Sequence, residues 1–228
     1  PCVPVIGNEI FDRKFLEVNE EKLNKAYSLL ADEKSKEVFK NYVNFEFSGK
    51  LQYLFSMESD ISDAFNDYLT LGEHENFIDI GAYRGDTVEQ FLSFTDGKYD
   101  NILAVEPDSK TYKKLVENCK ALKNFEAING AVSRTCGTVE FSNVAGRQST
   151  IGNGVEIQSF TLDKLAEKFV PTYIKIDAEG AEIDILNGGK SLISEHKPKI
   201  KIATYHKNRD IFEIPILLNK LNENYKIY

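Results

Sequence analysis

Two patterns of hydrophobic positions divide the chain near Gly72. Before it, apolar residues recur every three or four positions, as from Leu23 to Leu30, which predicts amphipathic helices. The pattern begins behind Asn19, a residue type that often caps the N-terminus of a helix. We expect an N-terminal helical segment over residues 1–72, with about three helices that act as a packing layer or a lid and carry no chemistry.

After Gly72, short strands rich in Ile, Val and Phe alternate with helical stretches. This alternation is typical of a mostly parallel sheet with helices on both faces and right-handed crossovers. We therefore expect a doubly wound α/β domain over residues 73–228. The strand candidates are NFIDI, NILAVE, NFEAIN, TYIKID and KIKIATY, and the helical stretches lie near 86–94, 109–122, 161–169, 179–194 and 210–222.

Two further strand candidates, TVEFSN and VEIQSF, flank a loop rich in Gly, Ser and Asn. They predict a hairpin with a long loop, inserted into the alternating scheme. A long loop above a ligand site is often a lid. Arg147, Gln148 and Ser149 of this loop are then candidates to bind a polyhydroxyl acceptor, and a loop without contacts is the alternative.

Charge and cysteine content narrow the classes of function. The net charge of −8 argues against nucleic acid, because neutralising phosphates requires a basic face. Three cysteines without a CxxC spacing suit reduced thiols better than disulfides or a zinc site. No apolar run approaches the roughly 20 residues that cross a bilayer, and the first residues do not resemble a signal peptide. We expect a cytoplasmic protein without a membrane span.

The stretch FIDIGAYRGDT and the strand after it contain the clearest candidate site. Ligands of parallel sheets bind beyond the carboxyl ends of the strands. Gly81 and Gly85 would let the backbone approach a ligand, and Glu106, about 20 residues on, ends the next strand where an acid can bind a ribose diol. Asp79 and Asp86 would repel a pyrophosphate but favour S-adenosylmethionine, whose ammonium and sulfonium are cationic. A nicotinamide-dependent oxidoreductase is the alternative.

The chain resembles the FkbM family of S-adenosylmethionine-dependent methyltransferases over roughly residues 76–228. The resemblance rests on FIDIGAYRGDT, AVEPDSKTYKKLVENC, AINGAVS and, above all, TLDKL followed by YIKIDAEGAEIDILNGG. It implies a Rossmann-like class I methyltransferase fold. It also implies O-methylation of a hydroxyl on a small molecule or a glycan precursor, with a donor-binding domain that has lost catalysis as a second alternative.

The resemblance also implies roles for individual residues. It implies that the donor is contacted by the glycine turn, its ribose by the acid ending the second strand, and its adenine by the two following turns. Tyr83, inside the glycine turn, is a further candidate for a donor contact. The residues implied are Asp79, Gly81 and Gly85 for the donor, Glu106 for the ribose, Pro107, Asp108, Gly130, Ala131 and Val132 near the adenine, and Asp177 in the active site, where we expect it near the methionine part of the donor or near the acceptor.

Methyltransferases of this class usually close the sheet with an antiparallel hairpin, and we expect either that this hairpin is lacking here or that another element covers the edge of the sheet. An open edge strand invites pairing with another chain, so we expect a homo-oligomer through this edge to be feasible.

Methyl transfer to oxygen needs a base that removes the hydroxyl proton. Asp177 ends TYIKID and His206 follows KIKIATY, which predicts both at the carboxyl end of the sheet as candidate catalytic residues. Glu179 and Glu182 fall in the predicted first turn of the next helix, where acids stabilise the helix dipole. A metal held by Asp177, Glu179 and His206 is an alternative, but the spacing shows no dedicated ligand set and we expect no metal.

Overall fold

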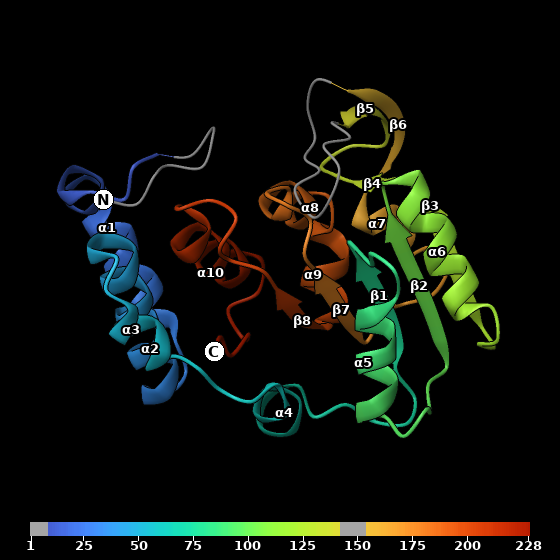
Figure 1. The fold of residues 1–228 in the computed structure, drawn as a ribbon, viewed down its shortest axis with the longest axis horizontal. Coiled ribbons are helices and arrows are strands. Elements are labelled where there is room, and N and C mark those ends of the chain that lie inside the picture. Colours follow the sequence, from blue (N-terminus) through green and yellow to red (C-terminus); the bar gives the residue numbers. More distant parts are fainter. Residues whose placement is uncertain (1–8, 142–153) are drawn as a thin grey trace. The chain divides into compact units, whose positions relative to one another are not determined.

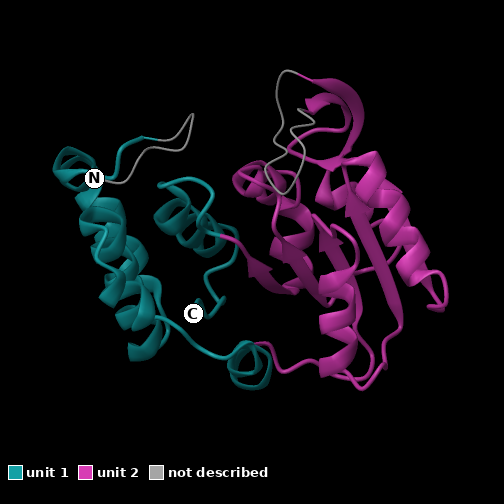
Figure 2. Cartoon of the chain, viewed as in Figure 1, with its two compact units in different colours: residues 1–68, 204–228 teal, residues 69–203 magenta. Residues whose placement is uncertain are grey.

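The computed structural model describes residues 9–141 and 154–228, which form two compact units (Figure 2). Residues 69–203 form one unit, which we call the sheet unit. Residues 1–68 and 204–228 form the other, which we call the helical unit. Each is described by itself below.

A five-stranded parallel sheet is the centre of the sheet unit (Figure 1). Its strand order is β3-β2-β1-β7-β8, so the chain winds outward from β1 in both directions. The central strands are buried on both faces and mostly apolar, as expected of parallel strands covered by helices. This confirms the predicted Rossmann-like fold. The strands are β1 (Asn76–Ile80), β2 (Asn101–Glu106), β3 (Phe125–Asn129), β7 (Tyr173–Ile176) and β8 (Lys199–Ile202).

Helices flank this sheet, and one predicted helix is divided in two. The stretch near 179–194 forms α8 (Glu182–Asn187) and α9 (Lys190–His196), separated by Gly188 and Gly189. A Cβ on Gly188 would lie 2.3 Å from the carbonyl oxygen of Ser133, so the chain passes too close there for any other residue. The remaining helices of this unit are α5 (Asp86–Phe94), α6 (Ser109–Cys119) and α7 (Leu162–Leu165).

Helix α5 covers the face of the sheet that carries alternate residues of β1 and β7. Phe91 of α5 stacks on Phe77 of β1 with ring centroids 4.6 Å apart, and Phe77 stacks on Tyr173 of β7 at 4.8 Å. Because side chains alternate along a strand, Asp79 and Lys175 lie on this same face, nearer the carboxyl ends. We call it the α5 face.

The predicted hairpin is present beside the main sheet. β5 (Gly137–Phe141) and β6 (Val155–Phe160) pair antiparallel, and β4 (Ala131–Val132) pairs parallel with β6. The three strands form a small second sheet of order β4-β6-β5. Only Gly130 separates the end of β3 from the start of β4, which places this sheet next to the carboxyl end of β3.

The N-terminal part of the helical unit contains more helices than the sequence predicts. The first helix begins at Arg13, where Asp12 accepts a hydrogen bond from the Phe15 N–H at 2.8 Å. The predicted cap at Asn19 is wrong, because this residue lies buried inside the helix and donates to the Phe15 carbonyl oxygen. The elements are α1 (Arg13–Leu29), α2 (Glu33–Ser48), α3 (Leu51–Phe55), α4 (Ile61–Asp63) and the π-helix η1 (Ala64–Leu69), whose last residue belongs to the sheet unit.

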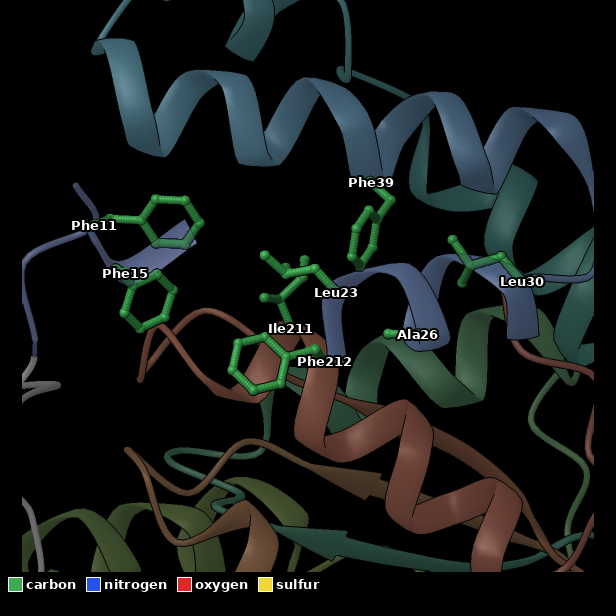
Figure 3. Packing of buried hydrophobic residues seen from close by; sticks show 8 residues of the cluster. All are labelled: Phe11, Phe15, Leu23, Ala26, Leu30, Phe39, Ile211 and Phe212. Atoms are coloured by element: carbon green, nitrogen blue, oxygen red, sulfur yellow. The ribbon is translucent and has the colours of Figure 1, made fainter. Parts of the chain in front are cut away.

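The last helix, α10 (Asp210–Leu221), belongs to the helical unit rather than to the sheet unit. Side chains from α1, α2 and α10 meet in one apolar cluster (Figure 3). The compact units therefore differ from the predicted boundary at residue 72, which assigns everything after it to one domain. The buried members of the cluster are Phe11, Phe15, Leu23, Ala26, Leu30, Phe39, Ile211 and Phe212.

No helix in the described ranges, 9–141 and 154–228, is long and apolar enough to cross a membrane.

Candidate functional site

The glycine turn after β1 is fixed by backbone contacts on both sides. The N–H groups of Gly81 and Ala82 both donate to the Val105 carbonyl oxygen of β2, at 3.0 and 3.1 Å. Gly81 has φ +75°, and a Cβ there would lie 1.9 Å from the carbonyl oxygen of Asp177. Only glycine fits this position, because both the conformation and the space exclude a side chain.

The second glycine of the turn starts helix α5. Gly85 has φ +92°, and a Cβ there would lie 2.9 Å from the Sγ of Cys119 on α6. Between the glycines, Tyr83 has φ +49°, a conformation that is unusual for a residue with a side chain. The guanidinium of Arg84 lies over the Tyr83 ring, 4.9 Å from its centre. The turn is thus strained at a residue that the sequence marks as a donor-contact candidate.

Glu106 ends β2 and links the two following turns. Its Oε2 accepts the Tyr83 N–H at 2.8 Å, and its Oε1 accepts the Asp108 N–H at 2.9 Å. The residue is only 6% exposed. Burial raises the pKa of the Glu106 carboxyl to about 7, although the two backbone N–H groups act in the opposite direction. A buried acid with two backbone donors is well placed to accept further hydrogen bonds.

The predicted adenine region is held together by a residue that the sequence reading missed. Asn129 ends β3, and its Nδ2 donates to the carbonyl oxygens of Glu106 and Pro107 at 2.9 and 3.1 Å. Asp108 caps α6 by accepting the Thr111 N–H at 2.7 Å. The amide of Asn129 therefore fixes the shape of the β2–α6 turn.

The turn after β3 approaches the second sheet closely. A Cβ on Gly130 would lie 2.8 Å from the Gln158 carbonyl oxygen. The next two residues, Ala131 and Val132, are buried in β4. Their direct contact with adenine stays a prediction.

Asp79 is fully buried and has partners within its own chain. Its Oδ2 accepts a hydrogen bond from Thr87 of α5, and its Oδ1 lies 3.3 Å from the Nζ of Lys175. This ion pair compensates the carboxylate, so the predicted repulsion of a pyrophosphate rests more on Asp86, which is exposed. A direct donor contact of Asp79 stays a prediction.

Asp177 follows β7 at the same end of the sheet, and its N–H donates to the Ile80 carbonyl oxygen at 3.1 Å. Glu179 precedes α8 with φ +50°, so its predicted place in the first helical turn is wrong. Glu182 begins α8 as predicted but is fully buried, and its Oε1 accepts the Ala178 N–H at 2.8 Å. A carboxylate oxygen of Glu182 lies within 4.8 Å of one of Asp177.

His206 lies four residues after the end of β8 and belongs to the helical unit. Its ring is 4.5 Å from that of Tyr205. The base role of His206 and the active-site role of Asp177 stay predictions. Arg147, Gln148 and Ser149 lie outside the described residues.

Lys175 and Thr87 are further members of the site that the sequence reading missed. A signal for Lys175 was available, since it is a charge inside the otherwise apolar strand YIKI. When β1 and β7 are aligned by their apolar residues, Lys175 falls opposite Asp79. Thr87 gave no comparable signal, because hydroxyl residues are common in the first turn of a helix.

A family model matches most of the sheet unit and part of the helical unit. Residues 79–226, more than half of the chain, match the model of the methyltransferase FkbM domain. The crystal structure of methyltransferase FkbM from Methylobacillus flagellatus KT is similar, with a TM-score of 0.80 and 21% identity over 93% of this chain. A precorrin-6y C5,15-methyltransferase from Geobacter metallireducens GS-15 has a TM-score of 0.45 and 12% identity, over 71% of this chain and 70% of its own. The curated proteins gave no match.

The chain spans 55% of the length of the Methylobacillus protein. Its likeness to that structure therefore concerns the fold of the shared part.

Proposed function

This chain belongs to the FkbM methyltransferase family, and from that premise we propose that it is an S-adenosylmethionine-dependent O-methyltransferase. We propose as acceptor a hydroxyl group on a small molecule or a glycan precursor. The observation that carries the donor assignment is the buried carboxylate of Glu106, which is bonded to the glycine turn through the Tyr83 N–H.

The residues present fit this donor. Each carboxylate oxygen of Glu106 accepts one backbone N–H, and an ionised carboxylate has about four acceptor positions. Two positions are therefore left for the two hydroxyls of a ribose. The glycine turn lies next to the same strand ends and is bonded to Glu106 through the Tyr83 N–H. Glu106 would hold the ribose, and the turn from Gly81 to Gly85 would hold the amino-acid part of the donor.

When bound, S-adenosylmethionine supplies an electrophilic methyl group that a hydroxyl oxygen takes by in-line displacement. The chain has to orient the hydroxyl and accept its proton. Asp177 is our candidate in the sheet unit, because it follows β7 directly beside the glycine turn. His206 is our candidate in the helical unit, because histidine is the side chain that most often serves as a general base.

The acceptor proposal follows the family and the polar character of this strand end. Asp177 and Glu179 offer oxygen acceptors suited to a molecule with several hydroxyls. The net charge of −8 disfavours nucleic acid as an acceptor.

Transfer of a labelled methyl group tests the acceptor class. The chain would be incubated with labelled donor and with nucleotide sugars, glycolipids, catechols and carboxylic acids in parallel. We expect label on a sugar hydroxyl. Label found only on catechols, carboxylates or nitrogen would contradict the acceptor proposal while leaving methyl transfer intact, and donor binding without transfer would favour a domain without catalysis.

A further inference from the structure

Three charged residues lie side by side across the α5 face of the sheet. Asp79 of β1 pairs in register with Lys175 of β7, and Lys175 pairs with Lys201 of β8. Asp79 is fully buried and Lys175 is 6% exposed. Charges in such surroundings are costly unless other groups compensate them, so this row needs an explanation beyond packing.

The Lys175 ammonium has three oxygen neighbours at the glycine turn. Its Nζ donates to the Gly81 carbonyl oxygen at 2.7 Å and to that of Ile80 at 3.4 Å. It also lies 3.3 Å from Oδ1 of Asp79. The ammonium thus has one acid and two backbone carbonyls as partners, all on β1 or the turn that follows it.

These contacts complete the fixation of the turn. The N–H of Gly81 is bonded to Val105 of β2, whereas its carbonyl is bonded to Lys175 of β7. One peptide segment is therefore held from both neighbouring strands. Thr87 connects the same group of residues to α5, because its hydroxyl donates to Asp79.

The charge of Lys175 also reaches Glu106. Glu106 lies two residues beyond Ala104, which is the register partner of Asp79, so Glu106 is on the α5 face as well. Burial is the main cause that raises the pKa of the Glu106 carboxyl; the charge of Asp108 raises it further, and the charge of Lys175 lowers it. Lys201 is the neighbour of Lys175 on β8. Its pKa is lowered, mainly by burial and next by the positive charge of Lys175.

We propose that Lys175 is a positioning residue of the donor site: it compensates Asp79 and holds the Gly81 carbonyl, and so fixes the glycine turn to which Glu106 is bonded. Asp79 then acts on the donor through Lys175 and the turn. This inference rests on the proposed function, since it assigns the residue to donor binding.

Calorimetric titration with S-adenosylhomocysteine between about pH 6 and 9 tests this role, together with thermal unfolding. The first variant is Lys175→Met, which removes the charge but leaves Asp79 buried without its cation. That variant is at risk of not folding, so the double variant Asp79→Asn with Lys175→Met removes both charges. The matched control is Lys199→Met, because Lys199 pairs with Glu75 at 2.8 Å at the amino end of the same sheet.

We expect both Lys175 variants to bind about tenfold more weakly near neutral pH, as loss of one charge-assisted hydrogen bond predicts. The midpoint of the pH dependence of binding should also move upward, a change that a purely structural role would not produce. Lys199→Met should alter unfolding without moving the midpoint. Folded Lys175 variants with wild-type affinity and an unchanged midpoint would overturn the inference alone. Failure of the unaltered chain to bind would overturn it together with the proposed function.

Discussion

The backbone N–H of Tyr83 donates to Oε2 of Glu106 at 2.8 Å, which joins the glycine turn after β1 to the acid that ends β2. Tyr83 holds φ +49° in this arrangement. The turn and the acid are therefore coupled, and a change in the charge of Glu106 acts on both. The predictions below concern the glycine turn, Glu106 and the candidate base.

Donor binding should depend on pH near neutrality. Burial raises the pKa of Glu106 to about 7, so folding favours its protonated form. The resulting stabilisation of the ligand-free chain is present below the ordinary carboxyl pKa and is lost as the pH rises through about 7. The ribose hydroxyls need the ionised form, so the affinity for S-adenosylhomocysteine should rise across the same range. Titrations at several pH values check this, and a flat profile from about pH 6 to 8 would contradict it.

Replacing Glu106 with alanine should weaken the binding of S-adenosylhomocysteine by about 1.5–3 kcal/mol, the range for hydrogen bonds to a charged group. The control is Glu126→Ala on β3, because Glu126 is an exposed acid that pairs with Lys168. We expect the control to bind normally. Equal affinities in the two variants would show that Glu106 does not hold the ribose.

Gly81→Ala should damage folding and donor binding together. The new Cβ would meet the Asp177 carbonyl oxygen at 1.9 Å, and φ +75° is strained for alanine. The strain and the overlap together should cost about 2–5 kcal/mol of unfolding free energy. Gly97→Ala is a matched control, since Gly97 has φ +71° but open space around its Cβ position.

The control variant should lose only about 1–2 kcal/mol, the cost of the left-handed conformation alone. Chemical denaturation of both variants measures the difference. A Gly81→Ala chain as stable as Gly97→Ala would mean that the turn does not pack against Asp177 as described.

His206→Ala should lower turnover about 10²–10⁴-fold while donor affinity stays nearly unchanged, as loss of a general base predicts. His74→Ala serves as the control. His74 lies before β1, is exposed and contacts Asp100. Single-turnover assays would compare the two. If His206→Ala retained normal turnover, Asp177 would become the candidate base, and Asp177→Asn would then be expected to show the loss.

The sheet could be predicted because its signals are local. The apolar runs predicted β1 and β2 at the positions where the structure has them. The helix predicted after Gly85 is also present there, as α5. The candidates Gly81, Gly85 and Glu106 followed from strand ends, since the carboxyl ends of parallel strands lie at one edge, whereas the adenine candidates followed from the family resemblance. For the same reason Glu106 could be connected with the glycine turn before any contact was known.

Long-range contacts could not be predicted in this way. Whether Asp79 faces a ligand or a partner depends on Lys175, almost 100 residues later, and on the register between their strands. The grouping of α10 with the N-terminal helices depends on the packing of Phe212 in their apolar cluster, which no local pattern encodes. The division between α8 and α9 likewise depends on the approach of Ser133 to Gly188.

Calorimetric titration of the chain with S-adenosylhomocysteine, with NAD titrated in parallel, tests donor specificity most directly. The proposed donor site predicts binding of S-adenosylhomocysteine with a dissociation constant on the order of micromolar, and no heat with NAD. Heat with NAD and none with S-adenosylhomocysteine would contradict it, and would instead support a nicotinamide-dependent oxidoreductase.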